Sequence, residues 1–201
     1  MSRIFLLLIL GFFAFGLVPQ LEAKTAKYVG VKKCATCHKK KKQGKQLAIW
    51  KKSKHSKTYQ VLASKKAKTR AAKMGVSGNP QQAEACLVCH TTSVGIEKSQ
   101  MGKRFKIENG VQCETCHGAG SLYRKKKVMK AIFKERGLDR KGDSPTAKKT
   151  GMLIASKNTC KRCHVKEIQV NVKTFKNPSF KPFNFKKRWK KIAHPVPARK
   201  G

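Results

Sequence analysis

The stretch Cys34-Ala35-Thr36-Cys37-His38 decides how this chain folds, because its pattern returns three more times. The other copies are Cys86-Leu87-Val88-Cys89-His90, Cys113-Glu114-Thr115-Cys116-His117 and Cys160-Lys161-Arg162-Cys163-His164. Together the four copies use all eight cysteines of the chain and four of its six histidines. On a helical turn, positions i, i+3 and i+4 share one face, so the two thiols and the imidazole of each copy would point the same way.

Cys-x-x-Cys-His is the attachment pattern of haem c, in which two thiols bind the porphyrin's vinyl groups and the imidazole ligates the iron. Disulfides or zinc sites could also use eight cysteines, but neither explains a histidine after every second cysteine. We therefore predict four covalently bound haem c groups. The predicted attachment residues are Cys34, Cys37, Cys86, Cys89, Cys113, Cys116, Cys160 and Cys163. The predicted iron ligands beside them are His38, His90, His117 and His164.

The N-terminus has the order of a secretory signal peptide. Arg3 precedes an apolar run from Ile4 to Val18, and Ala23 offers a small residue for cleavage. The alternative is an uncleaved anchor, but the run is shorter than the roughly 20 residues of a membrane span. We expect residues 1–23 to be removed and residues 24–201 to form one periplasmic domain; an extracellular or membrane-anchored protein is the less favoured outcome.

The composition is strongly basic, with 48 Lys and Arg against 9 Asp and Glu and a formal charge of +39. Eight haem propionates would lower this to about +31, which still favours acidic partners. Exposed lysines could instead serve solubility alone. We expect acidic redox proteins and an anionic membrane surface as partners, and export argues against nucleic acid. The oligomeric state does not follow from the composition.

The fold class indicated is mostly α, a compact multihaem cytochrome with little regular sheet. Helical composition dominates residues 43–73 and 122–136, and Asn184 would cap a last helix with Phe185 and Trp189 on one face. A short strand is expected at residues 104–107. A folded body of this size has a radius of gyration of about 16 Å. Four porphyrins would therefore lie close together and form much of the apolar core.

Only two further histidines, His55 and His194, can serve as distal iron ligands. At least two irons would then lack a second imidazole, being five-coordinate or ligated by a thioether, a lysine amine or a phenolate. The non-histidine candidates other than lysine are Met74, Met101, Met129, Met152 and Tyr123.

Several segments of the sequence resemble the tetrahaem cytochrome c-554 family. Gly30-Val31-Lys32-Lys33-Cys34 leads into the first motif, and Trp50-x-x-Ser53-x-His55 resembles the W-x-x-S-x-H segment of the family. Residues 110–120 are similar to its G-V-x-C-E-x-C-H-G-x-G signature. Phe183-Asn184-Phe185 and His194-Pro195 resemble its C-terminal aromatic helix and His-Pro ending.

The resemblance implies a helical fold with closely stacked haem pairs, a soluble periplasmic electron carrier and a five-coordinate second haem. It also implies His55 as distal ligand of the third haem and His194 of another, the fourth. One departure stands out, because Ser121-Leu122-Tyr123-Arg124 occupies the place of a family histidine. This departure puts bis-histidine ligation of the first haem in question.

The function favoured by these features is electron transfer between periplasmic redox partners. The alternatives are an enzyme that reduces a small nitrogen compound, such as nitric oxide, at a five-coordinate haem, or a subunit of an extracellular haem assembly. Carrier is preferred to enzyme because no acid or histidine cluster is available for proton delivery, and no catalytic residue is assigned.

Overall fold

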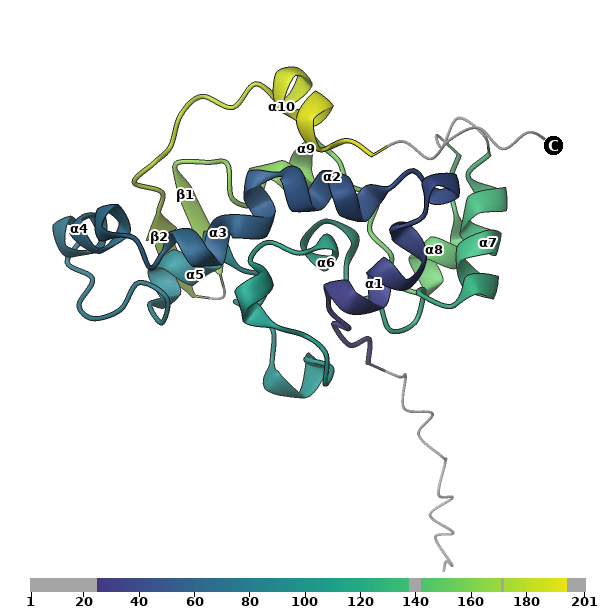
Figure 1. Ribbon diagram of the computed structural model, residues 1–201, viewed down its shortest axis with the longest axis horizontal. Coiled ribbons are helices and arrows are strands. Elements are labelled where there is room, and N and C mark those ends of the chain that lie inside the picture. Colours follow the sequence, from purple (N-terminus) through teal and green to yellow (C-terminus); the bar gives the residue numbers. More distant parts are fainter. Residues whose placement is uncertain (1–24, 138–141, 171, 195–201) are drawn as a thin grey trace, which may run out of the picture.

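The computed structural model describes residues 25–137, 142–170 and 172–194, and in these ranges helices dominate over one small sheet (Figure 1). This confirms the mostly α fold class. The predicted signal peptide, residues 1–23, and Pro195 lie outside the described residues. Within the described ranges, no helix has the length and apolar character needed to span a membrane.

Ten α-helices are described. They are α1 (Val31–His38), α2 (Gln46–Lys52), α3 (Thr58–Val61), α4 (Lys65–Lys73), α5 (Glu84–His90), α6 (Cys113–His117), α7 (Lys126–Glu135), α8 (Pro145–Lys149), α9 (Lys157–Lys161) and α10 (Phe185–Ile192). Short 3-10 turns occupy Lys41–Gln43, Lys54–Lys57, Lys98–Gln100 and Ile107–Asn109.

All four Cys-x-x-Cys-His motifs form the expected helical turn. The first three lie wholly within α1, α5 and α6. The fourth begins in α9, and the His164 amide still donates to the Cys160 carbonyl at 3.0 Å beyond the helix end.

The predicted helical region 43–73 is divided into three helices. Ser53 is extended, with φ −77° and ψ 159°, and ends α2. Ser64 begins α4 by accepting a hydrogen bond from the Ala67 amide at 3.2 Å. The last helix, α10, follows the prediction, because the Asn184 side chain caps it by accepting from the Lys187 amide at 2.9 Å.

The sheet is an antiparallel hairpin of β1 (Glu167–Val170) and β2 (Lys173–Lys176), with Glu167 opposite Lys176. Sequence reasoning missed this hairpin, and the strand predicted at residues 104–107 is wrong. The residues before α1 pair instead with the chain just ahead of residue 104. Tyr28 forms an isolated bridge with Met101, and the Tyr28 carbonyl accepts a hydrogen bond from the Gly102 amide at 2.8 Å. Residues after Gly102 turn away into the 3-10 segment Ile107–Asn109.

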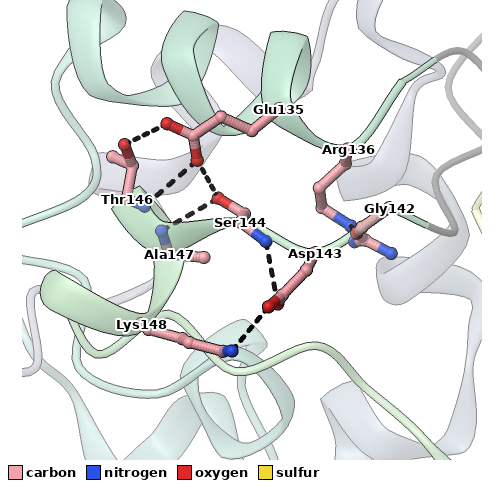
Figure 2. A network of polar contacts seen from close by, with 8 residues as sticks. All are labelled: Glu135, Arg136, Gly142, Asp143, Ser144, Thr146, Ala147 and Lys148. Carbon is pink, nitrogen blue, oxygen red and sulfur yellow. Dashed lines mark hydrogen bonds and ion pairs between the residues drawn. The ribbon is translucent and has the colours of Figure 1, made fainter.

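The apolar core is small. Where α7 packs on α8, Tyr123, Ile132 and Ala147 are buried and contact Met129 and Met152. The carboxylate of Glu135 at the end of α7 joins the two helices (Figure 2). In the described ranges only nine apolar residues are buried, scattered over the molecule. Side chains alone therefore supply little of the hydrophobic burial that a chain of this length needs.

Candidate haem-binding site

His55 is held against the third motif by backbone contacts. The Val111 amide donates to the His55 carbonyl at 3.1 Å, and the Trp50 indole donates to the Val111 carbonyl at 2.8 Å. Gly110 makes this approach possible, because a Cβ there would lie 2.9 Å from the His55 carbonyl oxygen and 2.5 Å from Thr58 Oγ1. Two of the segments that carry the family resemblance are thus in contact.

Two motif histidines have one ring nitrogen fixed by a backbone carbonyl. His90 Nδ1 lies 2.8 Å from the Thr58 carbonyl, and His117 Nδ1 lies 3.2 Å from the Leu153 carbonyl. A ring nitrogen that faces a carbonyl carries the proton, which leaves the other nitrogen with a free lone pair for a metal. Burial lowers the pKa of His117 to about 4, so its imidazole is neutral at pH 7.

The four motifs adjoin one another. A hydrogen bond between the thiols of Cys34 and Cys113 raises the pKa of Cys34 and joins the first motif to the third. The thiols of Cys89 and Cys163 join the second motif to the fourth in the same way. The third and fourth motifs meet where the Arg162 guanidinium donates to the Thr115 carbonyl at 3.2 Å.

The thiols fit neither of the alternatives to haem. All eight cysteines are free, and none forms a disulfide. Among the described residues, no group of three or more His, Cys, Asp or Glu side chains is arranged to hold a metal ion by itself. Burial raises the pKa of Cys116 to about 11.

Histidines far apart in the chain come together in two pairs. The rings of His55 and His164 are 6.2 Å apart between centroids, and those of His117 and His194 are 5.9 Å apart, with interplanar angles of 70° and 71°. An iron held by two imidazole nitrogens at about 2 Å each would place the centroids about 6 Å apart. Both pairs therefore fit an iron between their rings.

These pairs reverse the assignment that the family resemblance implied. His55 lies beside the histidine of the fourth motif, and His194 beside that of the third. The reversal has a physical basis in α10 and the preceding segment. Phe183 stacks on His164 at 4.5 Å, while α10 leads the chain away so that His194 reaches His117 (Figure 1).

Three of the other proposed distal ligands are engaged elsewhere. Met129 and Met152 pack against the core cluster at α7 and α8. The Tyr123 hydroxyl donates to the Gly118 carbonyl at 2.8 Å, and its ring is buried. Met101 lies in the backbone bridge with Tyr28, and Met74 follows the last turn of α4.

Sequence reasoning missed two residues that position the motifs. Glu114 is buried within the third motif and accepts from the amides of Val29, Gly30 and Gly120 at 2.7–2.8 Å. Thr58 binds the second motif through its carbonyl and donates its hydroxyl to the His90 carbonyl at 2.8 Å. For Glu114, the indication in the sequence was an acidic residue inside an attachment motif. No feature of the neighbouring sequence indicated the role of Thr58.

Comparison with known proteins finds similar sequences. Residues 33–118 match the family model described as cytochrome c554 and c-prime. Cytochrome c-554 from Nitrosomonas europaea is 30% identical over 150 residues, which cover 73% of this chain and 61% of that protein. The chain is thus similar to the cytochrome c-554 family over most of its length. It spans less than two thirds of the length of this relative. The structure of reduced cytochrome c554 from the same organism aligns with a TM-score of 0.49 at 25% identity, over 83% of this chain and 78% of that one.

The likeness to cytochromes c-554 implies covalently bound haem c. The residues present fit this group, because free thiols lie one helical turn apart and paired imidazoles lie at iron-spanning distances. The cysteines would hold the porphyrin edge and the histidines the iron, and the bound group supplies reversible one-electron chemistry.

Proposed function

We propose that this chain is an exported tetrahaem c-type cytochrome that transfers electrons between redox partners in the periplasm. The observation that carries the proposal is the contact among all four attachment motifs within one body. The Gly30 amide before the first motif donates to Glu114 of the third motif, Arg162 of the fourth motif donates to the third, and the Cys163 thiol donates to the Val88 carbonyl of the second. Four haems at these motifs would form a continuous series, and electron transfer is fast only between such close neighbours.

The small apolar core supports the count of four. Four porphyrins buried among the motifs would supply the hydrophobic contacts that the scattered buried side chains lack. Leu153 and Ile154 are 47% and 42% exposed directly beside the third motif, and a bound porphyrin would cover such apolar side chains.

The charge supports acidic redox partners. The helix α10 carries four exposed lysines and one exposed arginine, and His194 follows it. An acidic protein docked there would lie close to the His117–His194 pair. The apolar run at residues 4–18 supports export.

The test begins with the full chain, including residues 1–23, made in a host that attaches haem c. We expect the mass of a chain starting at Lys24 plus four haems, and a single acceptor should oxidise all four haems rapidly. A mass with fewer haems would contradict the tetrahaem proposal, and retention of residues 1–23 would contradict cleavage.

The order of the series is tested with two matched variants. C160A/C163A removes the fourth haem and should separate the second haem kinetically from the first and third. C34A/C37A removes a haem at one end and should leave the remaining three in rapid exchange. Equal effects of the two variants would overturn the proposed series.

A further inference from the structure

The histidine pairs determine which irons lack a second imidazole. The chain has six histidines, and all of them lie in the described residues. His55 faces His164 and His194 faces His117, so both non-motif histidines are used. The two motif histidines outside these pairs are His38 and His90. The family resemblance accounts for an open haem at His90, but not at His38.

His194 also lies close enough to His38 to lower its pKa, but among the described residues its ring pairs with that of His117. Tyr123, Met129 and Met152 are held in the packing of α7 and α8. Met74 lies at the end of α4, which is remote from α1 (Figure 1). The segment where relatives carry a histidine instead directs Tyr123 to the Gly118 carbonyl.

We propose that the haem attached at His38 has an open distal position that binds a small neutral diatomic ligand, such as carbon monoxide or nitric oxide. This inference rests on the proposed tetrahaem function. The protein would then have two haem irons that can bind an external ligand, at His38 and His90, and two irons whose distal positions are occupied by histidine.

A different observation concerns the other side of the same haem. His38 Nδ1 is buried without a hydrogen-bond partner, unlike the corresponding atoms of His90 and His117. Gln46 Oε1 is also buried and unpartnered, while Gln46 Nε2 donates to the Gln43 carbonyl. The Gln46 side chain is 9% exposed and interacts with the His38 ring. Gln43 Oε1 is buried and unpartnered as well, but Gln46 is the residue that interacts with the His38 ring, so a donor without an acceptor and an acceptor without a donor are neighbours.

We infer that Gln46 is a positioning residue whose amide oxygen accepts a hydrogen bond from His38 Nδ1. Partners of this kind orient a ligating histidine and increase its basicity. The acceptors for His90 and His117 are backbone carbonyls, whereas His38 depends on a side chain that substitution can change.

The first test titrates carbon monoxide into the reduced protein, after its mass has established four haems. We expect two equivalents bound per chain, and three in His194→Ala, which opens the iron at His117. One equivalent in the unsubstituted protein, or a first haem that stays low-spin in both oxidation states, would overturn the open site. Fewer than four haems by mass would instead contradict the proposed function, so the two failures are distinguishable.

The second test records the iron–histidine stretching bands of the reduced protein by resonance Raman spectroscopy, which only five-coordinate haems show. Gln46→Leu should lower the frequency of one band, and Gln46→Glu should raise the same band. The His90 band is the internal control, because its acceptor is the Thr58 backbone. Unmoved bands, or a shift caused by Gln43→Leu instead, would overturn the role of Gln46.

Discussion

At the scale of single residues, several residues of the family signature act through close contacts with other segments and not by binding haem themselves. Because Gly110 has no side chain, the His55 carbonyl can approach it closely, and the Val111 amide donates a hydrogen bond to that carbonyl. Glu114 ties the lead-in before α1 to the loop after the third motif through three backbone amides. These residues hold histidines and thiols in place without being haem ligands themselves.

Substitutions at Gly110 and Gly75 distinguish steric crowding from backbone strain. Both glycines have positive φ, +67° and +68°, but only Gly110 has close neighbours. A Cβ at Gly75 would meet nothing within 4 Å, so Gly75→Ala should cost about 1 kcal/mol. Gly110→Ala should cost about 2–4 kcal/mol, since it also displaces His55 and Thr58. Denaturant unfolding measures both. Only Gly110→Ala should alter the low-spin haem spectrum; equal spectra would contradict its role.

Glu114→Ala should lower the free energy of unfolding by about 3 kcal/mol, because it leaves three amides without an acceptor. The control is Glu108→Ala, an exposed position at which a change within about 0.5 kcal/mol is expected. Denaturant titration compares the two variants. Similar losses at both positions would show that the buried carboxylate has no special part.

At the scale of elements, α7 and α8 form the best-packed unit. Glu135 at the end of α7 accepts from the Ser144 hydroxyl and from the amide and hydroxyl of Thr146 at the start of α8 (Figure 2). Ser144 also caps α8 by accepting from the Ala147 amide at 3.0 Å. One carboxylate thus joins two helix ends across the loop between them.

This arrangement predicts an acid-dependent loss of stability. The hydroxyls of Ser144 and Thr146 hold the pKa of Glu135 below its ordinary value of 4.5. A carboxylate whose pKa is lower in the folded than in the unfolded protein stabilises the fold at pH values above its unfolded-state pKa. This contribution is lost as the pH falls through its folded-state pKa. Lys148 likewise holds the pKa of Asp143 below its ordinary value of 3.8, so Asp143 contributes with the same sign.

Glu135→Gln should therefore flatten the fall of Tm between about pH 5 and pH 3. Thr146→Val removes one donor and should give an intermediate slope. Thermal melts followed by circular dichroism measure the three curves. A slope in Glu135→Gln identical to that of the unsubstituted protein would contradict the assignment.

At the scale of the whole molecule, charge and cofactor content decide behaviour together. A formal charge of +39 opposes compaction, and few buried apolar side chains counter it. Covalent porphyrins would supply apolar contact area and acidic propionates at the same time. The protein is therefore expected to depend on haem attachment for folding as well as for redox chemistry.

Reduction by an acidic redox protein should slow markedly between ionic strengths of about 0.01 M and 0.15 M, because the screening length falls from about 30 Å to about 8 Å. Stopped-flow absorbance measures the rate. A neutral small-molecule reductant is the control and should show no such dependence. A rate that rises with salt would contradict an acidic partner.

The sequence by itself determined the attachment chemistry, the helical class and the capped last helix. Each depends on residues within one or two turns: Cys34, Cys37 and His38 act within a single turn, and Asn184 caps the helix beside it. The spacing of such residues is fixed by local backbone geometry, so their roles can be read from the chain.

Only the tertiary structure decided which histidine faces which, that α7 and α8 share Glu135, and that Glu114 anchors the lead-in. His55 meets His164, and His117 meets His194, across long stretches of intervening chain. The hairpin of β1 and β2 was missed, and the strand at residues 104–107 wrongly expected, for the same reason. Contacts between distant segments depend on how the whole chain packs, and no local pattern specifies them.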